Sequence, residues 1–330
     1  MLTAALALLL SAAATRAAIP WLQRQGAVAH ENDRTMHAGV IPKGGGLTLL
    51  IAAALSIAAL HPVTALGWTI LIGVIVLAAV SWRDDVGHLP AAIRLPVHLA
   101  VAALFVWSLP PDARVFQGLL PGWLDAVVAV VALAWMMNLY NFMDGINGIA
   151  GAETVAICAG YLALSAVGGA MISYAPLAAS VLGASLGFLV WNLREKPLVF
   201  LGDVGSVPLG FLMGALMIDL AVKGYWAAAL ILPSYFLADA TLTLLMRLWR
   251  GEKPWEAHRS HFYQRAARGM GAHLPVVRDI SLANAGLISI SALIAPAYRW
   301  ISVFVAVAVV AALLARFAQS GQAQSPGSGS

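Results

Sequence analysis

Residues 122–148 read GWLDAVVAVVALAWMMNLYNFMDGING, and this stretch decides the fold. From 122 to 142 the only charged residue is Asp125. A helix needs roughly 20 mostly apolar residues to cross about 30 Å of hydrocarbon. The residues from 138 to 148 are then rich in Asn, Asp and Gly. The stretch therefore predicts a transmembrane helix that ends in a polar segment at the membrane surface.

The same balance holds over the whole chain. Hydrophobic residues make up 61% of the 330 residues and charged residues 10%, with a mean hydropathy of +0.85. A soluble domain is roughly a quarter charged, so the composition excludes a soluble globular protein and predicts a polytopic membrane protein. The single cysteine, Cys158, excludes a disulfide framework and a cysteine-based zinc site.

Eleven apolar windows are candidates for membrane-spanning helices. They lie near 1–22, 45–61, 63–81, 92–109, 122–142, 147–167, 174–193, 206–222, 225–246, 279–296 and 298–317. Only His61 and Pro62 separate the second window from the third, so the count is ten or eleven. The windows are too long for the alternating strands of an outer-membrane barrel, and the expected fold class is an all-α transmembrane bundle. We expect one domain over 1–317 and a disordered tail over 318–330.

The basic residues predict the orientation. No basic residue precedes the first apolar run, whereas Arg16 and Arg24 follow it, which favours an uncleaved span with its N-terminus outside over a cleaved signal peptide. If the spans alternate from there, nearly all of the 19 basic residues fall on the cytoplasmic side. The exceptions are Arg114, Lys223 and Arg299. This bias is what the positive-inside rule predicts.

The polar residues gather on the predicted cytoplasmic side. The segments that hold most of them are 31–46, 83–88, 138–147, 194–206 and 255–268. A transporter or lipid flippase, the alternative class, would place ionisable residues near the bilayer midplane and on both faces. The distribution therefore favours an active site on the cytoplasmic face of the membrane.

Asp84 and Asp85 form the first candidate site. Two adjacent carboxylates repel each other unless water or a cation offsets their charge. The pair fits a divalent-metal or general-base site, and it fits a solvated helix end equally well.

The segment 138–148 carries a stronger signal. Asn138 and Asn141 share one face of a helix end, and Asp144 with Gly145 ends that helix. Amide and carboxylate oxygens that converge there suit Mg²⁺, which takes one or two carboxylates together with substrate phosphates. Helix capping explains one or two of these residues but not all of them, so a functional site is favoured.

Residues 200–206 read FLGDVGS and open the eighth window. Backbone N–H groups at such a helix start can bind an anion, while Asp203 can hold a cation. For this segment alone, an N-cap by Asp203 or Ser206 is the favoured alternative. The sequence KGGG at 43–46 is weaker still, because its glycines fit either approach to a phosphate or flexible entry into the membrane.

Residues 258–265 read HRSHFYQR and lie in a long basic loop, about 247–278. His258 and His261 could be two metal ligands, but zinc normally takes a third protein ligand, which the loop lacks. Arginine and histidine together fit a phosphate or pyrophosphate clamp better. Attraction to anionic lipid is a credible alternative for the other cations of the loop, Lys253, Arg265 and Arg268.

Carboxylates for Mg²⁺, cations for phosphates and a membrane-surface location together indicate phosphoryl-type transfer between a soluble nucleotide and a lipid carrier. The motifs at 138–148, 200–206 and 258–265 resemble those of the polyprenyl-phosphate N-acetylhexosamine-1-phosphate transferases, which are of the glycosyltransferase family 4 type. The resemblance spans residues 30–265. That family includes bacterial initiators of O-antigen, common-antigen and teichoic-acid synthesis and the peptidoglycan lipid I enzyme. The spellings NFMDG and HRSHFYQ look most like the O-antigen and common-antigen initiators.

The resemblance implies roles for individual residues. Asp203 and Asn141 would bind Mg²⁺, or Mn²⁺ in its place, with support from Asp144. Asp84 and Asp85 would sit beside the phosphate of the acceptor lipid. The residues that would bind the nucleotide sugar are Phe200 by stacking on uracil, Asn147 at the uracil edge, His258, Arg259 and His261 at the pyrophosphate or sugar, and Lys43 and Asn138 elsewhere on the substrate.

Some positions depart from the family pattern. His88 stands where many members have a third Asp, and Asn147 where most have Asp, although an amide can also accept from uracil N3–H. Asp239, which fits the family pattern, and Glu153 are acids inside spans, and each fits either a functional role or helix-to-helix bonding. The looser matches near the N-terminus are Asp33, Arg34 and His37.

The reaction that the resemblance implies is attack by the phosphate of undecaprenyl phosphate on the β-phosphorus of a UDP-N-acetylhexosamine, UDP-GlcNAc or a derivative. UMP leaves, and the product starts a lipid-linked cell-envelope glycan such as O-antigen of lipopolysaccharide. Direct attack is favoured over a covalent aspartyl intermediate. The expected partners are these two substrates and membrane lipids, with no nucleic acid and with a homodimer as one option. The expected location is the bacterial inner membrane.

Overall fold

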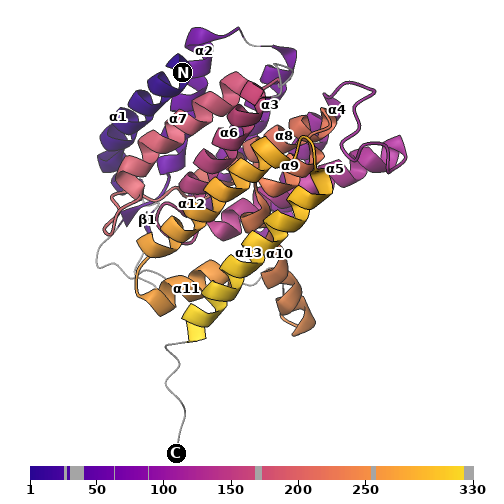
Figure 1. The fold of residues 1–330 in the computed structure, drawn as a ribbon. Coiled ribbons are helices and arrows are strands. Elements are labelled where there is room, and N and C mark those ends of the chain that lie inside the picture. The colour runs from indigo at the N-terminus through magenta and orange to yellow at the C-terminus, as the bar shows by residue number, and fades with distance from the viewer. Residues whose placement is uncertain are drawn as a thin grey trace, which may run out of the picture.

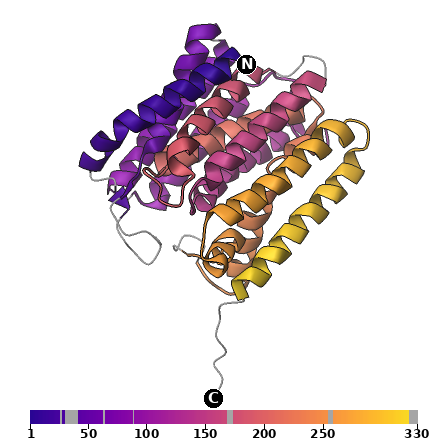
Figure 2. The ribbon, with the colours of Figure 1, turned by 60° about the vertical axis from the view of Figure 1, so that its left-hand side comes forward.

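The computed structural model describes residues 1–25, 28–29, 41–62, 64–87, 89–167, 173–253 and 258–322. It is a bundle of helices packed side by side (Figure 1, Figure 2), with one pair of two-residue strands, β1 (Val28–Ala29) and β2 (Ile41–Pro42). The predicted all-α fold class is confirmed. Four residues singled out from the sequence lie outside the described residues, and their roles stay predictions: Asp33, Arg34, His37 and His88.

Each predicted window holds a helix. The helices are α1 (Leu2–Arg24), α2 (Gly45–Leu60), α3 (Ala65–Gly87), α4 (Ala91–Trp107), α5 (Gly122–Met143), α6 (Ile149–Val167), α7 (Ala175–Asn192), α8 (Asp203–Val222), α9 (Trp226–Ile231), α10 (Ser234–Trp249), α11 (Phe262–Met270), α12 (Leu274–Ser289) and α13 (Arg299–Gln322). A π-helical turn, Ile290–Ile294, extends α12. The last helix runs past residue 317 to Gln322, and residues 323–330 lie outside the described part.

Where the structure describes the chain, fewer helices than windows meet the length and composition of a full span. Among the described residues, seven helices are long and apolar enough to cross a membrane: α1, α5, α6, α7, α8, α12 with its π turn, and α13. Helices α2 and α4 are apolar but shorter. The window 225–246 is interrupted at Leu232 and Pro233, between α9 and α10, because proline lacks the N–H that would continue a helix. The predicted loop 247–278 contains the helix α11.

Helix α8 forms the centre of the bundle. All of its residues from Val204 to Ala221 are buried, and α2, α3, α5, α6 and α9 pack around it. Gly210 lets α5 approach closely, since a Cβ there would lie 2.7 Å from the carbonyl oxygen of Met136. Small residues at such contacts are typical of helix packing in membranes. This packing fixes the start of α8, at Asp203, in the middle of one end of the bundle.

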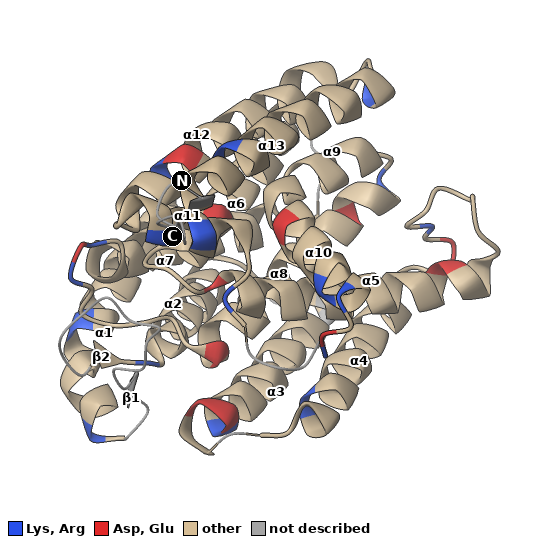
Figure 3. Ribbon diagram, turned by 90° about the horizontal axis from the view of Figure 1, so that it is seen from below, with Lys and Arg blue, Asp and Glu red and all other residues tan. Residues whose placement is uncertain are grey.

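Most ionisable residues collect at that end, which Figure 3 views directly. The starts of α2, α8, α11 and α12 meet the ends of α3, α5, α10 and α13 there. The other ends of α8 and α13 carry Lys223 and Arg299. The predicted gathering of polar segments on one face is therefore present, and the assignment of that face to the cytoplasm stays a prediction.

Candidate functional site

An acidic cluster lies where α3 ends and α8 begins. Asp84 and Asp85 belong to the last turn of α3, and Asp203 is the first residue of α8. Arg94, in the first turn of α4, bridges two of these carboxylates. Its Nη1 lies 2.5 Å from Oδ2 of Asp84 and 3.6 Å from Oδ2 of Asp203. Sequence reasoning missed Arg94, although it is the only Lys, Arg, Asp or Glu in an otherwise apolar helix, which was the available signal.

The carboxylate of Asp85, from α3, lies at the N-terminus of α8. Its Oδ2 accepts a hydrogen bond from the N–H of Val204 at 3.0 Å, and α8 has Gly202 as its N-cap residue, without a side-chain cap. The alternative favoured from the sequence, an N-cap by Asp203 or Ser206, is therefore wrong. The anion at this helix start is a carboxylate from α3, in a position that the partial positive charge of the helix stabilises. Burial raises the pKa of Asp85, although the hydrogen bond from Val204 opposes that rise.

The glycines at 44–46 pack against this helix start. The N–H groups of Gly45 and Gly46 each donate to a carbonyl oxygen of the segment 200–201 at 2.9 Å. A Cβ on Gly46 would lie 2.1 Å from Cα of Gly205. Close backbone contact, which only glycine permits, explains these residues better than flexible entry into the membrane. The pairing holds Lys43 close enough for its charge to act on Asp85.

Asp144 joins the acidic cluster from the end of α5. Burial raises its pKa well above the ordinary carboxyl value, and the charges of Asp203 and Asp85 raise it further, whereas the charge of Lys43 opposes the rise. We use the name acidic cluster for these four carboxylates, Asp84, Asp85, Asp144 and Asp203. All four were predicted from the sequence, and the structure brings them together.

The donor groups at the cluster suit Mg²⁺ better than zinc. Within the described parts of the chain, no three His, Cys, Asp or Glu side chains form a metal cluster. Mg²⁺ keeps several waters and needs only one or two carboxylates together with substrate phosphates. The side chain of Asp203 is 32% exposed and hydrogen-bonds with Asn141, whose Nδ2 also donates to Oγ of Ser206 at 3.2 Å. The predicted carboxylate and amide pair therefore lies together at an accessible position that fits this ion.

Three predicted substrate residues make contacts within the protein. Nδ2 of Asn138 donates to the carbonyl oxygen of Ala134 at 2.7 Å, one turn earlier in α5. Asn147 is buried, and its Nδ2 donates to the carbonyl oxygen of Arg194 at 2.9 Å. Phe200 is half-buried beside the glycines of α2. The amides stabilise the backbone around the cluster, and contacts of all three with a substrate stay predictions.

Asp239, inside α10, anchors residues 258–265, which we call the histidine loop. Its Oδ1 accepts from Nδ1 of His261 and from the N–H of Phe262, both at 3.1 Å. Its Oδ2 accepts from the N–H of Tyr263 at 3.0 Å. The carboxylate thus caps α11 from another helix. With the Nδ1 proton directed at Asp239, Nε2 of His261 is the nitrogen that remains for other partners.

Glu153, the other acid inside a span, has a different environment. It lies buried in α6, and its Oε2 accepts a hydrogen bond from Nδ2 of Asn284 at 2.6 Å. This contact joins α6 to α12, so helix-to-helix bonding accounts for Glu153. Asp239 differs because its partners belong to the histidine loop.

The histidine loop lies against the end of α5. The hydroxyl of Tyr263 donates to the carbonyl oxygen of Phe142 at 2.9 Å, and a Cβ on Gly145 would lie 2.2 Å from that hydroxyl. The rings of His258 and His261 stack with their centroids 4.9 Å apart. The contact places the predicted histidines beside the segment that carries Asp144.

Comparison with known proteins gives consistent matches. The family model described as glycosyl transferase family 4 matches residues 67–221, a region that contains the acidic cluster and Arg94. A probable undecaprenyl-phosphate N-acetylglucosaminyl 1-phosphate transferase of Bacillus subtilis (strain 168) is 26% identical over 294 residues, which cover 85% of this chain and 80% of that protein. A phospho-N-acetylmuramoyl-pentapeptide-transferase of Chlamydia trachomatis serovar L2 is 30% identical over 230 residues, which cover 59% of this chain and 68% of that protein. A decaprenyl-phosphate N-acetylglucosaminephosphotransferase of Mycolicibacterium smegmatis is 28% identical over 280 residues, which cover 73% of this chain and 69% of that protein.

Proposed function

This chain belongs to glycosyl transferase family 4, and we propose that it transfers N-acetylhexosamine-1-phosphate from a UDP-sugar, UDP-GlcNAc or a derivative, to undecaprenyl phosphate with release of UMP. It is a multi-pass membrane enzyme of the polyprenyl-phosphate phosphosugar transferase type. The observation that carries the proposal is the acidic cluster, together with Lys43 and Arg94, at the polar end of the bundle.

Transfer between two phosphorylated substrates needs positive charge where their phosphates meet. Lys43 and Arg94 supply cationic groups at the acidic cluster. Guanidinium groups bind phosphate oxygens through two N–H groups at once. Since Arg94 is held by Asp84, the acceptor phosphate would compete with that carboxylate for the same guanidinium.

Asp203 and Asn141 would hold the metal, Mg²⁺ or Mn²⁺, with Asp144 behind them. When bound, the ion supplies charge neutralisation at the donor pyrophosphate and at the departing UMP. The carboxylate of Asp203, which is partly exposed, gives access from the polar end of the bundle. The carboxylate of Asp144 would add negative charge to the metal-binding segment and so favour a divalent cation there.

The acceptor lipid needs little activation. A phosphate monoester has its second pKa near 6, so the lipid phosphate is mostly doubly ionised at about pH 7. Asp85 is engaged at the N-terminus of α8, and Asp84 is engaged by Arg94. The two carboxylates would therefore orient the acceptor, or take up a residual proton, rather than act as strong bases.

The donor would lie toward the histidine loop. His258, Arg259 and His261 would bind its pyrophosphate or sugar, and Asp239 would fix the ring of His261. Phe200 and Asn147 would contact uracil. We place the enzyme in a bacterial inner membrane with its N-terminus outside and its polar end in the cytoplasm, where UDP-sugars are made.

The deciding experiment is release of UMP by the purified protein. The protein would be given undecaprenyl phosphate, Mg²⁺ and a small panel of UDP-sugars, each with and without EDTA. We expect UMP only when lipid, metal and one N-acetylhexosamine donor are all present. Absence of UMP with every donor from folded protein, or uptake of a UDP-sugar into proteoliposomes without UMP release, would contradict the proposal.

A further inference from the structure

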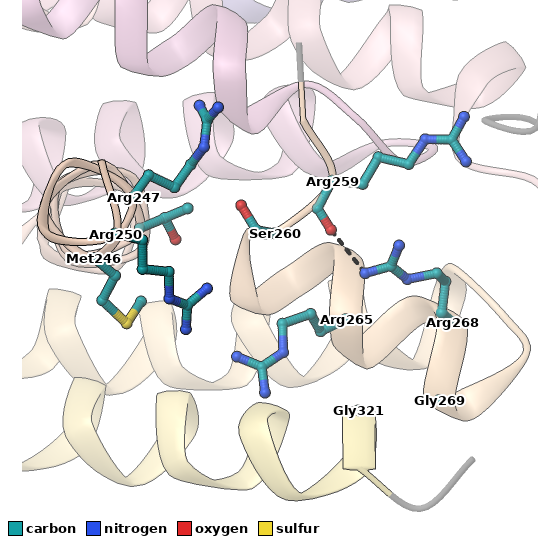
Figure 4. A pocket seen from close by; sticks show the side chains of 10 residues that line it. Met246, Arg247, Arg250, Arg259, Ser260, Arg265, Arg268, Gly269 and Gly321 are labelled. Carbon is teal, nitrogen blue, oxygen red and sulfur yellow. Dashed lines mark hydrogen bonds between the residues drawn. The ribbon is translucent and has the colours of Figure 1, made fainter. Parts of the chain in front are cut away.

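A polar cavity of about 570 Å³ opens between α10, α11 and the end of α13 (Figure 4). The arginines that line it are Arg247 in α10, Arg250 at the C-cap of α10, Arg265 and Arg268 in α11, and Arg259 before α11. Part of the histidine loop also lines it, whereas the described lining residues include no Asp or Glu and no member of the acidic cluster. We call the cavity lined by Arg247, Arg250, Arg265 and Arg268 the arginine cavity. Its composition indicates a site for an anion.

The spacing of the arginines concentrates their charge. The two arginines of each helix are three residues apart, so they lie on one face of that helix. Like charges this close repel each other, and an anion between the helices would offset the repulsion. Figure 4 shows the guanidinium groups of Arg250 and Arg265 turned toward one another across the cavity.

Arg247 lines the cavity and is held in place by hydrogen bonds. The residue is only 3% exposed. Its Nε donates to Oε2 of Glu252 at 2.7 Å and its Nη2 to the carbonyl oxygen of Lys253 at 3.1 Å. Within the described part of the chain, its Nη1 is buried without a hydrogen-bond partner. A buried donor without an acceptor is costly, and a phosphate oxygen is a strong acceptor for a guanidinium N–H.

Arg268 is also held in place. Its Nη2 donates to the carbonyl oxygen of Arg259 at 2.7 Å, a bond drawn in Figure 4. Arg265 lies over the ring of Phe262, with its guanidinium carbon 5.7 Å from the ring centroid. Side chains that are already ordered lose less conformational entropy when an anion binds.

The outer face of α10 identifies the source of the anion. Leu245, Leu248 and Trp249 are 54%, 47% and 91% exposed and directly precede Arg250. Exposed apolar side chains on a membrane protein face acyl chains, and tryptophan favours the level of the lipid headgroups. The cavity therefore opens beside the depth at which lipid phosphates lie.

We propose that the arginine cavity binds the phosphate headgroup of an anionic membrane phospholipid. The acyl chains would lie along the exposed leucines of α10, and the headgroup would join α10, α11 and α13. Because α11 begins at the histidine loop, occupancy would also stabilise that loop. Binding at this site does not require the transferase reaction.

Lipid retention in native mass spectrometry tests the proposal. The full chain in neutral detergent would be titrated with phosphatidylglycerol or with phosphatidylcholine. Wild type should retain phosphatidylglycerol in preference, and Arg250→Gln/Arg265→Gln should weaken its binding by about tenfold or more. The matched control Lys223→Gln/Arg299→Gln removes the same charge at the opposite helix ends and should bind as wild type does. Equal binding by the cavity variant and wild type would overturn the site.

A competition measurement and a second variant complete the test. Inorganic pyrophosphate at millimolar concentration should not displace the lipid, and displacement at the lipid's own potency would assign the cavity to a soluble phosphate instead. If the glutamine variant does not fold, Arg250→Lys/Arg265→Lys replaces it. That variant keeps the charge but loses the two-pronged contact, so we expect binding about threefold weaker or worse. Unchanged binding by a folded lysine variant would overturn the proposal.

Discussion

At the level of single residues, hydrogen-bonding and ion-pair partners allow the four acids of the acidic cluster to lie close together. Asp84 is paired with Arg94, Asp85 accepts from the start of α8, and Asp203 has Asn141 beside it. The acids themselves could be predicted, because polar residues at the end of apolar windows stand out. Their partners could not, because Asp85 and Val204 are 119 residues apart and only the packing of α3 on α8 joins them.

Replacement of the proposed metal ligand gives the first prediction. Asp203→Ala should lower kcat by about 10²–10³-fold or more, because it removes charge stabilisation at the reacting phosphates. The readout is UMP release at saturating lipid and donor. Asp112→Asn, an exposed acid in the loop before α5, is the control and should keep wild-type activity. Residual activity above about a tenth of wild type would contradict the role of Asp203.

The raised pKa of Asp144 predicts a pH-dependent stability without metal. Its carboxyl binds a proton more tightly in the folded than in the unfolded protein. The free energy of unfolding should therefore fall as pH rises from about 4, the ordinary carboxyl pKa, to the raised pKa, and stay low above it. Asp144→Asn cannot ionise, so in EDTA it should melt at a higher temperature than wild type near pH 8, with the gap closing toward about pH 4.

Thermal unfolding across this pH range measures the effect. Activity would be followed in parallel, since we expect Asp144→Asn to lose transfer while it gains stability. A melting temperature below that of wild type at about pH 8 would show that the ionised carboxylate stabilises the fold, contrary to this prediction.

At the scale of helices and loops, close backbone contact holds α2 against α8. Gly46→Ala would place a methyl group 2.1 Å from Cα of Gly205, and backbone cannot move aside as a side chain can. We expect a loss of about 1–3 kcal/mol in stability, seen as a lower melting temperature, together with lower activity. Gly286→Ala in α12, where nothing lies within 4 Å of the new Cβ, is the control and should be neutral or stabilising. Equal melting temperatures of the two variants would contradict the contact.

The junction of α10 and α11 gives the next prediction. Asp239→Asn loses the charge that holds Nδ1 of His261 and the N–H groups at the start of α11. Removal of such an orienting partner typically costs about 10–100-fold in activity. We expect that loss in kcat, with a smaller change in KM, and a shifted pH profile of kcat. A lower melting temperature with an unchanged pH profile would mean that Asp239 serves the fold alone.

Helix positions were easier to predict than helix breaks. The apolar windows at 122–142 and 206–222 match α5 and α8 closely, because span length follows from bilayer thickness. The window 225–246 gave no warning of the break at Pro233 beyond the proline itself. Helix α11 was read as a loop, because its residues are charged and its stability comes from Asp239 on another helix.

For the molecule as a whole, the predicted orientation can be tested with introduced cysteines. The single native cysteine, Cys158, is buried, so background labelling should be low. We expect Arg114→Cys to react with a membrane-impermeant maleimide in intact cells and Glu195→Cys to react only after permeabilisation. Both positions are exposed. The opposite pattern would invert the topology and would place the acidic cluster outside the cell.

The distribution of charge along the chain predicted that one end of the bundle would be polar, since each polar segment follows or precedes an apolar window. It could not show that the end is divided into two regions. The acidic cluster and the arginine cavity differ in charge, and the residues that build the cluster all precede those that build the cavity. Only the packing of α10, α11 and α13 separates Arg250 and Arg265 from the carboxylates.

The burial of α8 has a consequence for how activity is lost. Its amide protons should exchange with solvent more slowly than those of the peripheral helices, because local opening is least favourable where burial is complete. Helices α1 and α13 are mostly uncovered by protein and would loosen earlier. Asp203 begins the most protected helix, so fraying at the periphery should leave this proposed metal ligand in place. Heat inactivation should then coincide with cooperative unfolding of α8 rather than with loosening of the peripheral helices α1 and α13.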